Sequence, residues 1–221
     1  MSVQSSTGKF TGSSIGAKVI MAVTGILLYG FLIGHMLGNL TILMGADAIN
    51  AYAAGLRDLP FGALWVARIG LVVFFGLHIA TAIKLTVENR AARPVKYVYK
   101  NANSATYASR VMAITGTLLL TYLLFHLANF TFHMGVEGPF LDAEGRTDVY
   151  RMVVGTFQNP LFSGFYIVSM AVVGYHMAHG LSSMFQTLGL GRFEKVGPAI
   201  GWPVALGFAI IPVLVLAGVI Q

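Results

Sequence analysis

Each of four long apolar segments of the sequence contains a histidine, and four of the six histidines hold equivalent positions in these segments. They are His35, His78, His126 and His176. An imidazole is a common metal ligand and proton carrier, and an ionisable group is costly to bury in apolar surroundings. Any one of these histidines alone is equally well explained by a hydrogen bond to a neighbouring helix. Four histidines placed one per segment favour a shared functional role.

The segments that carry these histidines are long enough to cross a membrane. Of the 221 residues, 56% are hydrophobic and 10% are charged, and the mean hydropathy is +0.75. Soluble domains contain roughly 25% charged residues. Five segments reach the roughly 20 apolar residues that a membrane-spanning helix needs. The sequence therefore predicts an all-α integral membrane protein with one transmembrane domain over residues 1–221. The predicted spans are residues 15–44, 61–86, 108–134, 160–188 and 199–220.

Lys and Arg are distributed unevenly between the two ends of these spans. Ten of the 14 lie on the side of the N-terminus: Lys9, Lys18, Lys84, Arg90, Arg93, Lys96, Lys100, Arg110, Arg192 and Lys195. The opposite side has Arg57, Arg68, Arg146 and Arg151, and its link 137–151 is acidic. Basic residues collect in cytoplasmic loops, so we expect the N-terminus inside and the C-terminus outside. The same rule explains the excess positive charge without a nucleic-acid partner.

The surroundings of the four histidines repeat along the chain. Residues 18–25 read KVIMAVTG and residues 110–116 read RVMAITG, and in each a histidine follows the methionine by 14 residues. Residues 76–80 and 174–178 both read Gly-x-His-x-Ala. The first and third spans run outward and the second and fourth run inward. The two halves are therefore parallel repeats, and equivalent histidines must lie at equal depth.

Depth decides how the histidines pair. His35 and His126 lie past the middle of outward-running spans, displaced by about 7 Å towards the outside. His78 and His176 lie past the middle of inward-running spans and are displaced towards the cytoplasm. Each pair is suited to supply the two axial imidazoles of a b-type haem in a bundle of the first four spans. With no cysteine, the chain has no thiolate for an iron–sulfur cluster, a disulfide or a covalent c-type haem.

Several polar residues are candidates for contact with the two haems. Arg68 precedes His78 by ten residues, about 15 Å along the helix, and would reach the propionates of the outer haem. Lys84 would serve the inner haem. Both long side chains have the alternative of extending to the membrane surface. Asn39 and Asn129, which follow the outer histidines, are candidates for helix capping or for contact with a haem edge.

Small residues near the histidines would leave room for a flat macrocycle between helices. The alternative is ordinary close packing of membrane helices, in which glycine is frequent. These residues are Gly34, Gly38, Gly76, Ala80, Gly174 and Gly180.

With these features the chain resembles, over nearly its whole length, the cytochrome b subunit of the di-haem succinate:quinone oxidoreductase and quinol:fumarate reductase family. The resemblance is carried by one histidine in each of the first four spans, a fifth span without a ligand, and the sequences HMLGNL at 35–40 and HLANF at 126–130. In the family, glycines follow the fourth ligand four and thirteen residues later. His176 has both glycines and His179 has neither. His179 is then a neighbour of the haem site, near a propionate or a quinone pocket on the cytoplasmic side.

The resemblance implies partners and a location. A flavoprotein would interconvert succinate and fumarate, and an iron–sulfur subunit would dock on the cytoplasmic face. The chain would relay electrons to menaquinone or ubiquinone through two haem b groups in the inner membrane of a prokaryote, and alone would oxidise no succinate. Some relatives have a buried glutamate two residues before the fourth ligand. Gly174 stands there, so a proton route through that position is not expected.

Two other functions fit parts of the pattern. The first is the cytochrome b anchor of another quinone-linked enzyme, such as a hydrogenase or formate dehydrogenase. The respiratory bc type places its ligand histidines about four turns apart on one helix, a spacing that no histidine pair has here. The second is a proton-coupled transporter, in which buried histidines relay protons. A transporter would purify without colour, whereas a b-type cytochrome is red.

Overall fold

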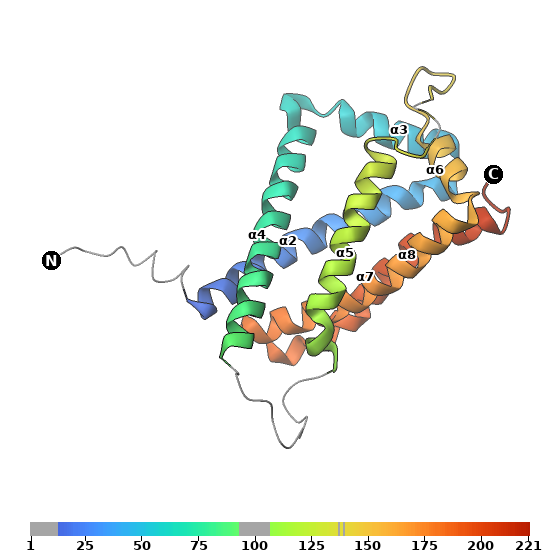
Figure 1. The fold of residues 1–221 in the computed structure, drawn as a ribbon. Helices are drawn as coiled ribbons and strands as arrows, with labels where there is room; N and C mark the ends of the chain where they lie inside the picture. The colour runs from blue at the N-terminus through green and yellow to red at the C-terminus, as the bar shows by residue number, and fades with distance from the viewer. Residues whose placement is uncertain (1–12, 93–106, 137, 139) are drawn as a thin grey trace.

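Five long helices form the body of the protein (Figure 1). The computed structural model describes residues 13–92, 107–136, 138 and 140–221. The five helices are α2 (Ser14–Leu40), α4 (Ala63–Ala91), α5 (Tyr107–Phe130), α7 (Pro160–Thr187) and α8 (Val196–Leu216). All five are long and apolar enough to cross a membrane. The prediction of an all-α protein with five membrane-spanning helices is confirmed.

Shorter elements cover the two ends of this bundle. The 3-10 turn η1 (Thr41–Met44) continues α2, and α3 (Ala46–Arg57) then lies across the end of the bundle where the C-terminus is found (Figure 1). The turn η2 (Pro60–Gly62) leads into α4. On the same end α6 (Val149–Phe157) precedes α7, and at the opposite end η3 (Gly191–Phe193) connects α7 to α8.

Local sequence sets where these helices begin and end. The Ser13 hydroxyl accepts a hydrogen bond from the Gly16 amide at 3.0 Å at the start of α2. Asn159 does the same for the Leu161 amide at 2.9 Å, with Pro160 in the first turn of α7. The third span ends at Phe130 rather than at residue 134, because His133 and Gly135 adopt positive φ angles that a helix cannot contain.

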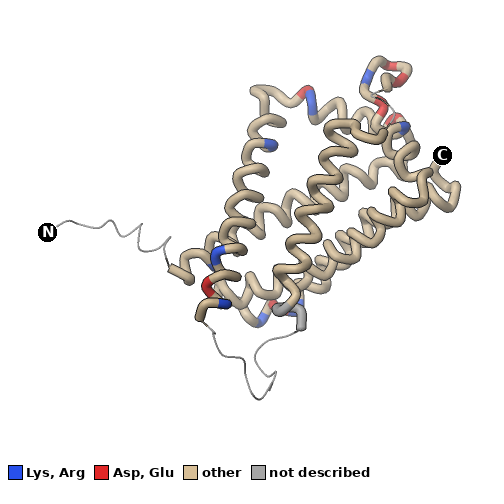
Figure 2. Tube along the Cα trace, viewed as in Figure 1, with Lys and Arg blue, Asp and Glu red and all other residues tan. Residues whose placement is uncertain are grey.

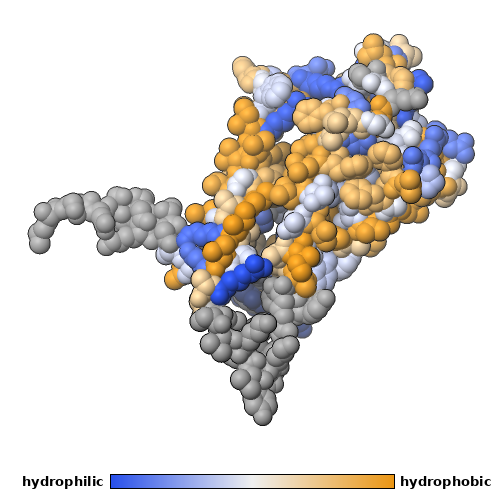
Figure 3. All heavy atoms as spheres, viewed as in Figure 1, coloured by the Kyte–Doolittle hydropathy of each residue, from blue (hydrophilic) through white to orange (hydrophobic). Residues whose placement is uncertain are grey.

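The helices differ in how much of their surface the protein itself covers. Of the five spans, α7 is the most buried and α4 and α5 are the least. Glycine allows α7 and α8 to pack closely, since a Cβ on Gly201 would lie 2.7 Å from the Ala178 nitrogen. Figure 3 shows that the face formed by α4 and α5 is mostly hydrophobic. A surface of this kind faces lipid.

Hydrogen bonds of a buried asparagine connect α3 to the link between α5 and α6. Asn50 on α3 is 2% exposed, and its amide nitrogen donates to Asp142 at 3.3 Å and Asp148 at 3.1 Å. Its carbonyl oxygen accepts from the Tyr150 amide at 3.0 Å. Arg146 adds a bond to Asp142 at 2.8 Å. These contacts, which we call the outer clasp, fix the link between α5 and α6 onto α3.

Charged residues lie mainly at the two ends of the bundle (Figure 2). The end formed by the start of α2, the end of α4 and the α7–α8 connection holds Lys18, Lys84, Arg90, Arg192 and Lys195. The end with α3 and α6 holds Arg57, Arg146 and Arg151. Lys9, Arg93, Lys96, Lys100 and Glu137, which also entered the prediction of orientation, lie outside the described residues.

Candidate haem sites

The outer histidine pair meets between two helices. His35 of α2 and His126 of α5 have ring centroids 6.0 Å apart, with the ring planes at 81°. Since an imidazole nitrogen binds a transition metal at about 2 Å, the ring centres of two axial ligands lie roughly 6 Å apart across one metal. Aromatic rings surround the pair, with Phe31 stacked on His35 at 5.3 Å and Phe208 at 5.6 Å. The donor set and its spacing fit a bis-histidine haem.

Three polar side chains lie beside the outer pair. The Tyr166 hydroxyl donates to the Asn129 carbonyl oxygen at 3.1 Å and lies 3.4 Å from Nδ1 of His126. Asn129 is 1% exposed. The Asn39 amide nitrogen donates to the backbone carbonyl of His35 at 2.8 Å and lies 3.4 and 3.5 Å from its two ring nitrogens. Asn39 and Asn129 are therefore neighbours of the outer histidines, while Tyr166 was not foreseen.

Each inner histidine lies against the other helix of its own half of the chain. Nδ1 of His78 on α4 is 3.3 Å from the Thr24 hydroxyl on α2. Nδ1 of His176 on α7 is 3.0 Å from the Thr115 hydroxyl on α5. The inner pair thus draws one ligand candidate from each half of the chain.

The glycines after these threonines repeat the symmetry. A Cβ added to Gly25 would lie 3.6 Å from Cε1 of His78, and a Cβ added to Gly116 would lie 3.6 Å from Cε1 of His176. Both rings therefore rest on a Thr-Gly step of the neighbouring helix. The sequence contained the signal for these threonines, because Thr-Gly occurs in both copies of the repeat.

The two pairs occupy different depths. Thr24, which marks the depth of His78, precedes His35 by eleven residues on α2. Thr115, which marks the depth of His176, precedes His126 by eleven residues on α5. Eleven residues correspond to about 16 Å along a helix. The inner and outer histidine levels are therefore separated by the same distance in both halves of the chain.

The remaining predicted site residues lie away from these contacts. The Arg68 guanidinium carbon lies 4.9 Å from the centre of the Trp65 ring, and Arg68 is exposed. The Lys84 ammonium is 2.6 Å from the Glu88 carboxylate. His179 is half-buried, three residues beyond His176 on α7. A role of these three residues beside a haem stays a prediction.

The small residues near the histidines fall into two groups. A Cβ on Gly34, Gly76 or Gly180 would meet no atom within 4 Å. For Gly38 and Gly174 the expectation was wrong. A Cβ on Gly38 would lie 2.5 Å from the ring of Tyr52, and a Cβ on Gly174 would lie 2.6 Å from the ring of Trp202. These two glycines make room for protein side chains.

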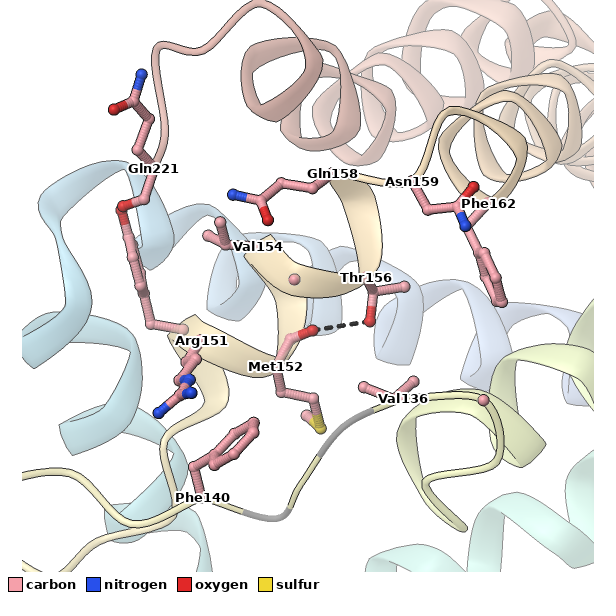
Figure 4. Close-up of a pocket in the computed structure, with 13 residues that line it drawn as sticks. Val136, Phe140, Arg151, Met152, Val154, Thr156, Gln158, Asn159, Phe162 and Gln221 are labelled. Carbon is pink, nitrogen blue, oxygen red and sulfur yellow. Dashed lines mark hydrogen bonds between the residues drawn. The ribbon is translucent and has the colours of Figure 1, made fainter.

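A cavity of about 590 Å³ lies at the outer end, next to α6 (Figure 4). Its walls combine apolar side chains such as Met152 and Phe162 with polar ones such as Gln158. Phe162 packs on Phe125 at 5.7 Å, and Phe125 packs on Tyr166 at 5.9 Å. Aromatic rings thus connect this cavity to the outer histidine pair.

Fold and site together define a multi-pass membrane protein with two pairs of histidines between its helices. The chain belongs to the succinate dehydrogenase/fumarate reductase transmembrane subunit family, whose family model matches residues 86–216. The chain is similar to the succinate dehydrogenase cytochrome b558 subunit of Bacillus subtilis (strain 168), with 27% identity over 173 residues. The alignment covers 76% of this chain and 77% of that relative. No solved structure matches the chain.

Proposed function

We propose that this chain anchors a succinate:quinone oxidoreductase in the membrane and holds two haem b groups. His35 and His126 would hold the outer haem, and His78 and His176 would hold the inner haem. The observation that carries the proposal is the outer pair, whose ring centroids lie 6.0 Å apart. The equivalent contacts of His78 with Thr24 and of His176 with Thr115 support the inner pair. When bound, haem b supplies reversible one-electron chemistry.

The chain's own residues would hold these groups and keep water away from them. The four imidazoles come from different helices, so each site also fixes the helices relative to one another. Apolar and aromatic side chains such as Phe31 and Phe208 surround the outer pair and exclude water. Polar contacts at Nδ1, from Thr24 and Thr115 for example, orient the rings, as is usual for metal-ligating histidines.

The partners follow from membership of the family. A flavoprotein that interconverts succinate and fumarate and an iron–sulfur subunit would complete the enzyme on the cytoplasmic face. The described part of the chain consists of membrane helices and short connections, so succinate oxidation would require these partners. The excess of basic residues at the N-terminal end of the bundle supports a cytoplasmic N-terminus. The location in a prokaryotic inner membrane is part of the same proposal.

The outer cavity is our candidate for the quinone site. Its volume of about 590 Å³ suits a ring-sized ligand, and the side-chain amide of Gln158 offers a hydrogen bond to a carbonyl oxygen. Aromatic packing through Phe162 and Phe125 leads from this cavity to Tyr166. Substitution Gln158→Leu should raise the KM for quinone without changing the haem spectrum. An unchanged KM would show that quinone binds at another site.

Single alanine variants of the four histidines test the pairing in the intact complex. Because His35 and His126 hold one iron, His35→Ala and His126→Ala should lose the same one of two low-spin b-type absorption signals. His78→Ala and His176→Ala should both lose the other signal. If the first two variants lost different signals, the proposed pairing would be wrong.

Family membership favours this function over the two alternatives. A transporter needs no haem, and its purified form would show no b-type absorbance. An anchor for another quinone-linked dehydrogenase would bind haem but would copurify with different soluble subunits. The subunits that copurify from native membranes therefore distinguish the second alternative.

A further inference from the structure

The repeated Thr-Gly step has a specific place beside the inner histidines. Thr24 on α2 contacts His78 on α4, and Thr115 on α5 contacts His176 on α7. Both threonines are buried, at 4% and 9% exposure. In each case the hydroxyl lies at Nδ1, with distances of 3.3 and 3.0 Å. Equivalent residues of the two repeats thus make the same contact.

The hydroxyl protons of both threonines already have acceptors. Thr24 donates to the backbone carbonyl of Ile20 at 2.8 Å and lies 3.1 Å from that of Met21. Thr115 donates to the carbonyl of Met112 at 3.1 Å. A hydroxyl has one proton and two lone pairs, so while each threonine donates to its backbone carbonyl, its oxygen can only accept from the histidine. This arrangement corresponds to the histidine tautomer that has its proton on Nδ1 and donates it to the threonine oxygen.

We propose that Thr24 and Thr115 are positioning residues that hold His78 and His176 with the proton on Nδ1. The other ring nitrogen, Nε2, is then free of a proton and available as a metal ligand. An Nδ1–H bond of this kind also makes the ligating nitrogen more basic, which stabilises the ferric state. The inference rests on the proposed haem ligation by these two histidines.

The outer pair lacks this symmetry. Tyr166 donates its proton to Asn129 and so can accept from Nδ1 of His126, but at the longer distance of 3.4 Å. Asn39 presents a donor nitrogen almost equally close to both ring nitrogens of His35. Loss of a threonine hydroxyl should therefore change the inner haem and leave the outer haem unchanged.

Valine and serine variants of both threonines in the full complex test this inference. Valine keeps the shape of threonine and removes the acceptor, whereas serine keeps the acceptor. Thr81→Val is the matched control, because Thr81 is equally buried and bonds only the carbonyls of Leu77 and His78. The readouts are the midpoint potential of each haem, its low-spin electron paramagnetic resonance signal and the haem content.

We expect Thr24→Val and Thr115→Val to shift the potential of one haem upward, or to lose that haem alone. The serine variants and Thr81→Val should match the wild type. Wild-type potentials and signals in both valine variants, or the same shift in Thr81→Val, would overturn the inference. So would loss of both haems from the valine and serine variants alike. A wild-type complex without haem would instead refute the proposed function.

Discussion

His176 and His179 lie three residues apart on α7, which is about 300° of helical rotation, so they point in similar but not identical directions. His176 contacts Thr115 at Nδ1, in symmetry with His78 and Thr24. We therefore expect His176→Ala to lose the low-spin signal of the inner haem. His179→Ala should retain both haems and at most shift a potential or slow quinone turnover. Optical redox titration of both variants checks this, and the reverse outcome would show that the repeats are misaligned in the fourth span.

Gly174 occupies the position at which some relatives carry a glutamate, and the structure shows why a larger residue does not fit. A Cβ there would lie 2.6 Å from the ring of Trp202 and 3.0 Å from the Cβ of Ala205. Gly174→Ala should therefore destabilise the packing of α7 on α8 by about 1–3 kcal/mol. Gly164→Ala is the control on the same helix, because a Cβ there meets no atom within 4 Å. Thermal unfolding of the complex compares the two. Equal stability of the two variants would show that α8 accommodates the added methyl group without loss of stability.

At this scale the sequence singles out four histidines, whose role as ligands stays a prediction, and two of their neighbours, Asn39 and Asn129. The histidines stand out because an ionisable group is rare in an apolar span, and the repeat orders them by depth. Tyr166 could not be chosen, because its contact with His126 depends on how α5 and α7 are rotated against each other. The rotation of α7 against α8 likewise decides that Gly174 faces Trp202, so the sequence could not predict this contact.

Two helices outside the predicted spans, α3 and α6, shape the outer end of the molecule. Hydropathy detects apolar segments long enough to cross the membrane. It therefore predicted the five spanning helices but not these two, which are too short. Their positions depend on the outer clasp, which joins Asn50 to residues of the α5–α6 link roughly a hundred positions away. No local pattern around Asn50 predicts such distant partners.

Removing the Asn50 side chain should loosen this outer end. Asn50→Ala leaves the Tyr150 amide without its acceptor, at a cost of about 1–3 kcal/mol for a buried polar group left unpaired. Asp142 and Asp148 lose one bond each and keep those from the Arg146 side chain and the Arg151 amide. Limited proteolysis of the α5–α6 link in membranes measures the effect. Asp47→Asn is the control, since it removes only an exposed ion pair with Arg146. Equal cleavage of both variants would show that Asn50 does not hold the link.

The outer clasp should also respond to acid. Desolvation raises the pKa of Asp142, but hydrogen bonds from the backbone and side chain of Arg146 outweigh it, and the net pKa is lowered. A lowered pKa in the folded state adds stability above the ordinary carboxyl range, near pH 4, and this stability is lost as the pH falls through the folded value. The protection factor of the link amides is the ratio of their intrinsic to their observed hydrogen-exchange rate, which corrects for the intrinsic effect of pH. It should be constant from about pH 7 to 5 and fall below about pH 4. A fall that begins near neutral pH would contradict this.

For the whole molecule, the asymmetry of charge predicts which end meets the soluble subunits. The link that contains Asp142 and Arg146 should face away from the cytoplasm, and the end with Arg192 and Lys195 should face towards it (Figure 2). An impermeant reagent added to intact cells should label a cysteine introduced at Glu144 and miss one introduced at Lys195. The sequence contains no native cysteine to interfere. The opposite labelling would exchange the inner and outer assignments of the two sites.

Whether the molecule holds two haems is the claim on which the rest of the account depends. The direct measurement is the amount of haem b per chain in the purified, assembled complex, determined by the pyridine haemochrome spectrum together with quantitative amino-acid analysis. Two pairs of histidines at two depths predict two haem b per chain, both low-spin. One haem or none per chain in a correctly assembled complex would contradict the account.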